Sequence, residues 1–148
     1  MNSPEQASAP LVSAVIPAYK AAYIIETIEA IKQQTYDNIE IVVVDDGSPE
    51  NLKETLSAYI DNGAIRYVHQ ENQKMAAAKN TGIGHATGDY IAFVDDDDLW
   101  YPEKIAKQVS VLSNPDIGLV YTFAEGLRNG KRSKIQNFQR CVEGDAVD

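Results

Sequence analysis

The sequence predicts an α/β fold in which helices cover both faces of a mostly parallel sheet. Short runs of apolar residues, rich in Val and Ile, recur at intervals of roughly 25 residues, as expected for strands that alternate with helices. The segments between the runs are long enough for helices, and two of them carry apolar residues at helical spacing. Nearly continuous runs of Val and Ile are typical of parallel strands that are buried on both faces.

Each run marks an expected strand, and the strands cover residues 11–16, 39–44, 65–68, 90–94 and 117–123. Three helical stripes accompany them, formed by Ile24, Ile28 and Ile31, then by Leu52, Leu56 and Tyr59, and then by Ile105, Val109 and Leu112. Residues 125–139 show neither the strand period nor the helix period, and Asn129-Gly130 is a candidate hairpin turn. We therefore expect strands and helices to alternate from residue 11 to residue 123.

Length and charge narrow the classes of protein to which this chain can belong. Its 148 residues suffice for one domain, and we expect a flexible leader at residues 1–10 and a single domain over residues 11–148. The 22 acidic and 13 basic residues give a formal net charge of −9, which argues against binding to nucleic acid. No apolar run is long enough for a transmembrane segment, and the leader lacks the features of a secretory signal. Because a single cysteine, Cys141, excludes an internal disulfide, we expect a cytoplasmic protein.

Polar residues follow the first, second and fourth expected strands. The first is followed by Pro17-Ala18-Tyr19, the second by Asp45-Asp46-Gly47-Ser48, and the fourth by four aspartates at residues 95–98. Ligands of open parallel sheets bind at the carboxyl ends of the strands, so these residues are the candidate site. We expect the six carboxylates to gather on one rim of the sheet.

Such a gathering of carboxylates predicts a divalent metal. Two unit charges about 4 Å apart repel by roughly 4 kcal/mol at an effective dielectric of 20, so the cluster is costly without a cation. Carboxylates are hard oxygen ligands that suit Mg²⁺ or Mn²⁺. In an extended segment Asp95 and Asp97 share one side and Asp96 faces the other, which forms an Asp-x-Asp pair. The alternative is that residues 95–98 form only a solvated turn.

The Asp45–Ser48 segment also has two interpretations. It can be a turn in which Gly47 takes a positive φ and Ser48 caps the next helix. Its carboxylates can also accept hydrogen bonds from a base N–H or from ribose hydroxyls, and the two interpretations are compatible. Tyr19 can stack on a base or simply pack at the strand end.

Three motifs give the chain a family resemblance. They are residues 12–19 (VSAVIPAY), residues 34–48 (QTYDNIEIVVVDDGS) and residues 88–104 (GDYIAFVDDDDLWYPEK). Together they resemble the family 2 glycosyltransferases, which have the GT-A, Rossmann-like nucleotide-diphospho-sugar transferase fold. The resemblance covers about residues 11 to 105, in order and with similar spacing.

The resemblance implies inverting transfer of a sugar from a nucleotide diphosphate donor, with a UDP-sugar as the expected donor, to a hydroxyl of a saccharide or lipid-linked acceptor. It implies Mg²⁺ or Mn²⁺ at the diphosphate, with Asp97 as first and Asp95 as second choice of ligand. Because such acceptors include lipid-linked ones, the expected cytoplasmic location includes a peripheral position at the inner face of a membrane. The residues that the resemblance assigns to the nucleoside, base and ribose are Pro17, Ala18, Tyr19, Asp45, Asp46, Asp95 and Asp96.

Two departures from the family pattern affect the interpretation. The family often has Asn-x-Gly-x-(Ser or Ala)-x-Ala-Arg-Asn before the fourth strand, whereas residues 72–80 (NQKMAAAKN) have Lys74 for the glycine and Lys79 for the arginine. Lys79 keeps a cation for the donor phosphate or ribose, and Lys74 is a solvated lysine at a helix start. No residue matches the general base of the family, so we expect the donor-binding half of a truncated domain.

Two other functions compete with glycosyl transfer. The first is a non-catalytic module that binds a nucleotide sugar. The second is a phospho-accepting receiver domain, which shares an α/β sheet with acidic strand ends but needs an acidic pair where this chain has Pro17-Ala18-Tyr19. We expect His69, His85 and Trp100 to have surface or packing roles.

Overall fold

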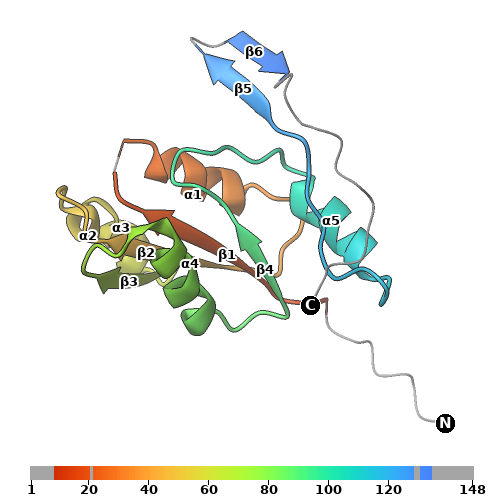
Figure 1. Ribbon diagram of the computed structural model, residues 1–148, viewed down its shortest axis with the longest axis horizontal. Coiled ribbons are helices and arrows are strands. Elements are labelled where there is room, and N and C mark those ends of the chain that lie inside the picture. The colour runs from red at the N-terminus through yellow and green to blue at the C-terminus, as the bar shows by residue number, and fades with distance from the viewer. Residues whose placement is uncertain (1–8, 21, 129–130, 135–148) are drawn as a thin grey trace. The chain divides into compact units, whose positions relative to one another are not determined.

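Four parallel strands form the central sheet, in the order β3-β2-β1-β4 (Figure 1). The computed structural model describes residues 9–20, 22–128 and 131–134. The strands are β1 (Val12–Ala18), β2 (Ile39–Asp46), β3 (Arg66–Gln70) and β4 (Tyr90–Phe93). The helices are α1 (Ile24–Lys32), α2 (Leu52–Thr55), α3 (Ser57–Asp61), α4 (Lys74–His85) and α5 (Lys104–Leu112). The parallel sheet with helices on both faces confirms the predicted α/β fold.

The helices α1 and α4 lie on opposite faces of the sheet (Figure 1). Helix α1 buries residues three or four apart, which form one stripe: Ile24, Thr27, Ile28 and Ile31. The second predicted helix is divided into α2 and α3 at Leu56. Helix α5 carries the third predicted stripe, and none of the helices in the described ranges is long and apolar enough to cross a bilayer.

Helix α4 packs closely on strands β1 and β2. Val15, Val42, Val44 and Ala78 form a buried cluster on this face of the sheet. Gly82 makes the close approach possible, because a Cβ atom there would lie 2.3 Å from Cγ1 of Val15. The approach sets the distance between α4 and the sheet, and α4 begins at the edge where the strands end.

Strand β1 continues two residues beyond its predicted end and includes Pro17 and Ala18. A proline is tolerated in this central strand because the sheet is narrower at that point. The Val15 carbonyl accepts a hydrogen bond from the Val94 N–H toward β4, and the position of Pro17 faces the same side after β4 has ended. Pro17 therefore removes no hydrogen bond from the four-residue ladder between β1 and β4.

Two other strands also continue beyond their predicted ends. Strand β2 continues to Asp46, so that Asp45 and Asp46 belong to the strand, and β3 continues to Gln70. The chain divides into two compact units, Met1–Ala106 and Lys107–Asp148. At the start of the first unit the Ala9 carbonyl accepts a hydrogen bond from Nδ2 of Asn38 at 2.6 Å; residues 1–8 lie outside the described ranges.

The predicted strand at residues 117–123 is wrong. The segment is apolar but belongs to neither described sheet, and Leu119 and Phe123 are 74% and 82% exposed. An apolar segment forms a strand only where a neighbouring strand is available to pair with it. The second unit instead contains the antiparallel strands β5 (Glu125–Arg128) and β6 (Lys131–Lys134), which flank the candidate hairpin turn although their residues show no strand period in the sequence. The candidate turn at Asn129-Gly130 lies outside the described residues.

Candidate functional site

The parallel strands β1, β2 and β4 bring their carboxyl ends to the same edge of the sheet. Strand β1 lies between the other two, so the predicted carboxylates form two groups rather than one. Strands are spaced about 4.8 Å apart, which separates β2 from β4 by about 10 Å. Within the described ranges no group of three or more His, Cys, Asp or Glu side chains is arranged to hold a metal ion. The six carboxylates therefore lie on one rim of the sheet, as predicted, but in two groups that the end of β1 separates.

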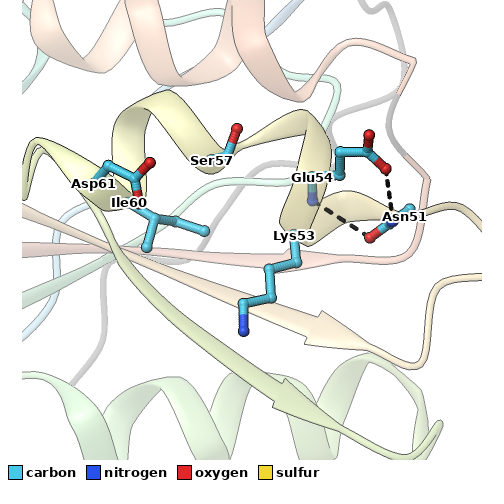
Figure 2. A pocket seen from close by; sticks show the side chains of 6 residues that line it. All are labelled: Asn51, Lys53, Glu54, Ser57, Ile60 and Asp61. Carbon is cyan, nitrogen blue, oxygen red and sulfur yellow. Dashed lines mark hydrogen bonds between the residues drawn. The ribbon is translucent and has the colours of Figure 1, made fainter.

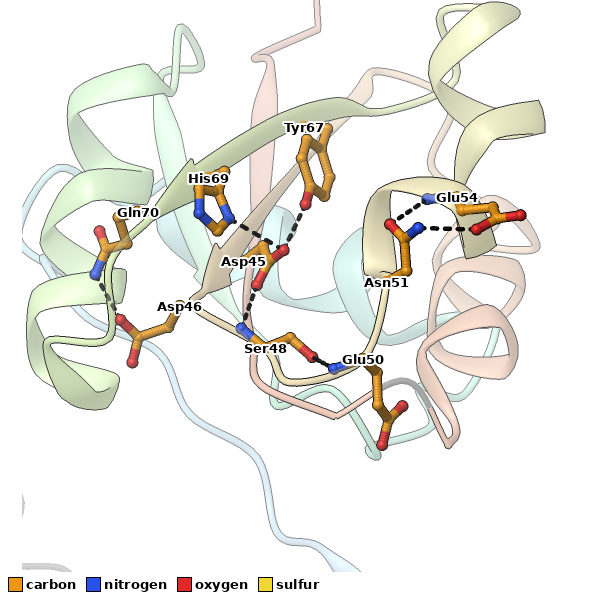
Figure 3. Close-up of polar contacts among 9 residues, drawn as sticks. All are labelled: Asp45, Asp46, Ser48, Glu50, Asn51, Glu54, Tyr67, His69 and Gln70. Carbon is orange, nitrogen blue, oxygen red and sulfur yellow. Dashed lines mark hydrogen bonds and ion pairs between the residues drawn. The ribbon is translucent and has the colours of Figure 1, made fainter.

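Asp45 is buried, and its hydrogen bonds connect the end of β2 to the following turn and to β3 (Figure 3). Its Oδ1 accepts from the Ser48 N–H at 2.8 Å, and its Oδ2 accepts from the hydroxyl of Tyr67 and lies 3.2 Å from Nδ1 of His69. Burial and the hydrogen bond to Asp45 raise the pKa of Tyr67 far above its ordinary value, so the hydroxyl remains a donor. Each oxygen of Asp45 therefore already accepts one hydrogen bond from within the protein, and the His69 ring lies beside Oδ2.

Asp46 is equally buried but keeps one oxygen available. Its Oδ1 accepts a hydrogen bond from Nε2 of Gln70 at 2.8 Å (Figure 3). The Gln73 N–H donates to the same oxygen, also at 2.8 Å, whereas no described residue donates to Oδ2. Every fully buried side-chain polar atom in the described ranges has a partner, so Oδ2 must reach the surface. Of the two aspartates of β2, Asp46 is the one that has acceptor capacity for a ligand.

The residues after β2 confirm one part of the turn interpretation and correct another. Gly47 has a φ of 65°, and a Cβ atom there would lie 2.7 Å from the backbone nitrogen of Asn72. Only glycine fits this conformation and this contact. The residue that caps the next helix is Asn51, whose Oδ1 accepts from the Glu54 N–H, and not Ser48 as predicted.

The aspartates after β4 form a turn and not an extended segment. The Asp98 N–H donates to the Asp95 carbonyl at 3.1 Å, so the alternation expected for a strand does not apply. Oδ2 of Asp96 accepts from the backbone N–H groups of Tyr19 and Lys20, at 3.1 and 3.2 Å. Asp97 is exposed. The four side chains therefore have different environments, and the Asp96 carboxylate is bound to the end of β1.

The acidic turn fits a divalent ion that takes part of its ligands from a substrate. Burial and the charges of Asp95 and Asp97 raise the pKa of Asp98, which indicates concentrated negative charge. Mg²⁺ is commonly bound by one or two carboxylates together with substrate phosphates and water, so no third protein ligand is required. The carboxylates of Asp95 and Asp97 provide hard oxygen donors of this kind.

The two lysines that depart from the family pattern have different positions. Lys79 of α4 places its Nζ 3.7 Å from Oδ1 of Asp95 and 5.4 Å from the centre of the Phe93 ring. Lys74 begins α4, as predicted, and has a φ of 75°, which is rare for residues other than glycine. The glycine of the family pattern therefore coincides with a left-handed backbone position that a lysine occupies here.

Two cavities lie beside α2. One, of about 390 Å³, is lined by residues of α2, α3 and the residue before α2, and includes no predicted site residue (Figure 2). The other, of about 560 Å³, extends from α2 to β3 and includes Asp45, Tyr67 and His69. The larger cavity therefore adjoins the carboxyl ends of β2 and β3.

Sequence reasoning missed Tyr67, His69 and Gln70, which all contact the aspartates of β2. A signal was available, because the carboxyl end of β3 lies at the same edge of the sheet as the other strand ends. The predicted end of β3 at Val68 left His69 and Gln70 outside the strand. Of the other residues given packing roles, Trp100 is buried, and the Lys104 Nζ lies 4.7 Å from the centre of its ring.

Known proteins match most of the chain. An uncharacterized glycosyltransferase of Rickettsia felis is 44% identical over 108 residues, which are 72% of this chain and 18% of that protein. The glycosyltransferase GlyG of Streptococcus pneumoniae is 48% identical over 92 residues, which are 60% of this chain and 31% of that protein. WfgD of Escherichia coli, a UDP-Glc:alpha-D-GlcNAc-diphosphoundecaprenol beta-1,3-glucosyltransferase, is 32% identical over 120 residues, which are 80% of this chain and 47% of that protein. The chain thus spans less than half the length of each of these relatives.

Solved structures match as well. The mannosyltransferase PcManGT from Pyrobaculum calidifontis, in complex with GDP-Man and Mn²⁺, has a TM-score of 0.67 and 28% identity over 78% of this chain and 36% of that chain. TarS of S. aureus, residues 1–349 in complex with UDP-GlcNAc, has a TM-score of 0.63 and 23% identity over 70% of this chain and 31% of that chain, which shows the shared GT-A fold. The family described as Glycosyl transferase family 2 matches residues 13–141. The chain belongs to glycosyl transferase family 2.

Proposed function

We propose that this chain binds the donor of a metal-dependent, inverting glycosyltransferase that moves a sugar from a UDP-sugar to a hydroxyl of a saccharide or lipid-linked acceptor. The observation that carries the proposal is the arrangement around the end of β1. On one side Asp46 has an accessible oxygen, and on the other side Asp97 is exposed in an acidic turn. Among the matching proteins, WfgD is named for UDP-Glc and PcManGT was solved with GDP-Man and Mn²⁺.

The nucleoside of the donor would lie at the end of β1, beside β2. Pro17 and Ala18 would line this position, and the half-exposed ring of Tyr19 would stack on the base. Asp46 would accept a hydrogen bond from the base through Oδ2. Asp45 would act without touching the base, since the Ser48 N–H and the Tyr67 hydroxyl already donate to its two oxygens.

The diphosphate would lie at the acidic turn. Asp97 would be the first ligand of a Mg²⁺ or Mn²⁺ ion and Asp95 the second, and the ion would supply Lewis-acid stabilisation of the departing phosphate. Lys79 would bring a cation to the phosphates or the ribose from the α4 side, where it already approaches Asp95. Asp95, or the remaining oxygen of Asp96, would contact the ribose. Such a protein would act in the cytoplasm, including at the inner face of a membrane.

A second candidate function is binding of the nucleotide sugar without transfer. No residue of this chain is assigned the role of general base, and a missing base costs roughly 10²- to 10⁴-fold in rate. Donor binding is therefore the property that this chain is expected to show most clearly. The receiver-domain alternative receives no support from the end of β1, where Pro17, Ala18 and Tyr19 provide no carboxylate.

Calorimetric titration with UDP and UDP-glucose, with and without Mn²⁺, tests the proposal. We expect binding that strengthens when Mn²⁺ is present, and slow release of glucose from UDP-glucose in a following hydrolysis assay. Binding without any hydrolysis or transfer would favour the non-catalytic module. Absence of nucleotide binding under all conditions, or labelling of an aspartate by a small phosphodonor, would contradict the proposal.

A further inference from the structure

The side-chain amide of Gln70 connects Asp46 to helix α4. Its Nε2 donates to Oδ1 of Asp46 at 2.8 Å, and its Oε1 accepts from Oγ1 of Thr81 at 2.6 Å. A flipped amide would turn Oε1 toward the carboxylate, so that two acceptors faced each other. Only one orientation of the amide therefore satisfies both neighbours, and it is the one observed.

The same contacts fix the orientation of the Asp46 carboxylate. Its Oδ1 accepts from two donors, the Gln70 amide (Figure 3) and the Gln73 N–H, while no described residue donates to its Oδ2. Rotation of the carboxylate would break both hydrogen bonds of a side chain that is only 5% exposed. Asp46 is therefore held with one particular oxygen toward the surface.

A fixed acceptor distinguishes nucleobases by the hydrogens on their pairing edges. Uracil and guanine carry a ring N–H that donates to a carboxylate, whereas the corresponding ring nitrogen of cytosine is an acceptor and only its amino group donates. A carboxylate that is free to rotate can move to meet the amino group. One that is held in place keeps its lone pairs facing the ring nitrogen of cytosine, which is unfavourable.

We propose that Gln70 is a positioning residue that fixes the Asp46 carboxylate and thereby makes the site prefer uracil or guanine nucleotides over cytosine nucleotides. The inference rests on the proposed function, because it takes Asp46 as the acceptor for the base. It adds a specificity determinant that lies outside the three motifs that carry the family resemblance, at the carboxyl end of the edge strand β3.

Affinities for UDP and CDP, measured by calorimetry with Mn²⁺ present, test the inference. We expect the parent chain to prefer UDP, and Gln70→Leu to reduce the ratio of the two affinities by roughly tenfold, the size of a lost hydrogen bond to a charged group. Thr81→Val, which is nearly isosteric, leaves the amide free to flip and should reduce the ratio less, by about threefold. Thr87→Val is the matched control, because it removes a threonine-to-carboxylate hydrogen bond at Glu40, away from the site.

The outcomes separate the inference from the proposed function. If Gln70 served folding alone, Gln70→Leu would lower the melting temperature and weaken the binding of UDP and CDP equally. An unchanged ratio of the two affinities would therefore overturn the inference and leave the proposed function intact. If Gln70→Leu does not fold, Thr81→Val replaces it in the test, and an unchanged ratio of the UDP and CDP affinities in that variant would overturn the inference. Equal affinity of the parent chain for UDP and CDP would also overturn the inference, and absence of any nucleotide binding would overturn both.

Hydrogen exchange of the Gln70 side-chain amide, followed by NMR in the ligand-free chain, provides a test without nucleotides. The network predicts slower exchange for Gln70 than for an exposed glutamine amide, and faster exchange in Thr81→Val than in Thr87→Val. Rapid exchange of the Gln70 amide in the parent chain would contradict the inference regardless of the affinities for UDP and CDP.

Discussion

The Asp96 carboxylate accepts a hydrogen bond from the backbone N–H of Tyr19 at 3.1 Å, so the acidic turn after β4 is bound to the end of β1. The N–H of Lys20 donates to the same oxygen at 3.2 Å. We predict that Asp96→Ala lowers the free energy of unfolding by about 1–2 kcal/mol, because two backbone donors lose a charged acceptor. Urea denaturation measures the change.

The matched comparison is Asp97→Ala, which removes an exposed carboxylate from the same turn. It should change the free energy of unfolding by less than about 0.5 kcal/mol. Equal destabilisation by the two substitutions would show that Asp96 has no special role in holding the end of β1.

Two glycines of α4 should respond oppositely to replacement by alanine. A Cβ atom at Gly82 would lie 2.3 Å from Cγ1 of Val15, whereas one at Gly84 would have no neighbour within 4 Å. We predict that Gly82→Ala destabilises the protein by about 1–3 kcal/mol through overpacking, and that Gly84→Ala stabilises it by about 0.5–1 kcal/mol through helix propensity. Thermal unfolding of both variants checks the pair, and a stabilising Gly82→Ala would contradict the close packing of α4 on the sheet.

Replacement of Lys74 by glycine should relieve the backbone strain at this position. Its φ of 75° costs a residue with a Cβ atom about 1 kcal/mol, so Lys74→Gly is expected to raise the free energy of unfolding by about that amount. Lys74→Ala removes the same charge but keeps the Cβ atom, and it should give no such gain. If alanine stabilised the protein as much as glycine, the effect would come from the charge and not from the backbone.

Protonation of Glu40 should lower the stability of the protein at acid pH. Its burial raises the pKa, but hydrogen bonds from Ser13 and from the backbone and side chain of Thr87 outweigh burial and hold the pKa below its ordinary value of 4.5. A carboxyl whose pKa is lowered by folding contributes stability above its unfolded pKa and loses it as the pH falls through the folded value. We therefore predict that the melting temperature of Glu40→Gln falls less than that of the parent chain between about pH 6 and pH 3. Parallel pH profiles for the two proteins would contradict the assignment.

The positions of the sheet's strands and of helix α1 along the chain could be predicted because their signals are local. The runs of Val and Ile at β1 and β2 mark buried parallel strands, and the stripe of Ile24, Ile28 and Ile31 marks the buried side of α1. The segment at 117–123 is also mostly apolar but has no place in a described sheet, since pairing depends on partners that composition does not reveal.

The polar residues at the ends of β1, β2 and β4 could be located from the sequence, but their individual environments could not. Strand order places β1 between Asp46 and the acidic turn, and neither spacing nor composition along the chain contains that order. The turn at Asp95–Asp98 depends on one backbone hydrogen bond, so the alternation expected for a strand failed there. Gln70 lies 24 residues from Asp46 along the chain, and its role depends on a contact between neighbouring strands.

The dependence of UDP binding on Mn²⁺, compared between the parent chain and Asp97→Ala by calorimetry, tests the central claim most directly. The control is Asp116→Ala, which removes an exposed aspartate of the second unit. If the acidic turn holds the metal against the diphosphate, Mn²⁺ strengthens UDP binding by the parent chain and by Asp116→Ala, and this gain disappears in Asp97→Ala. A gain of equal size in Asp97→Ala would contradict the assignment of the acidic turn as the metal site.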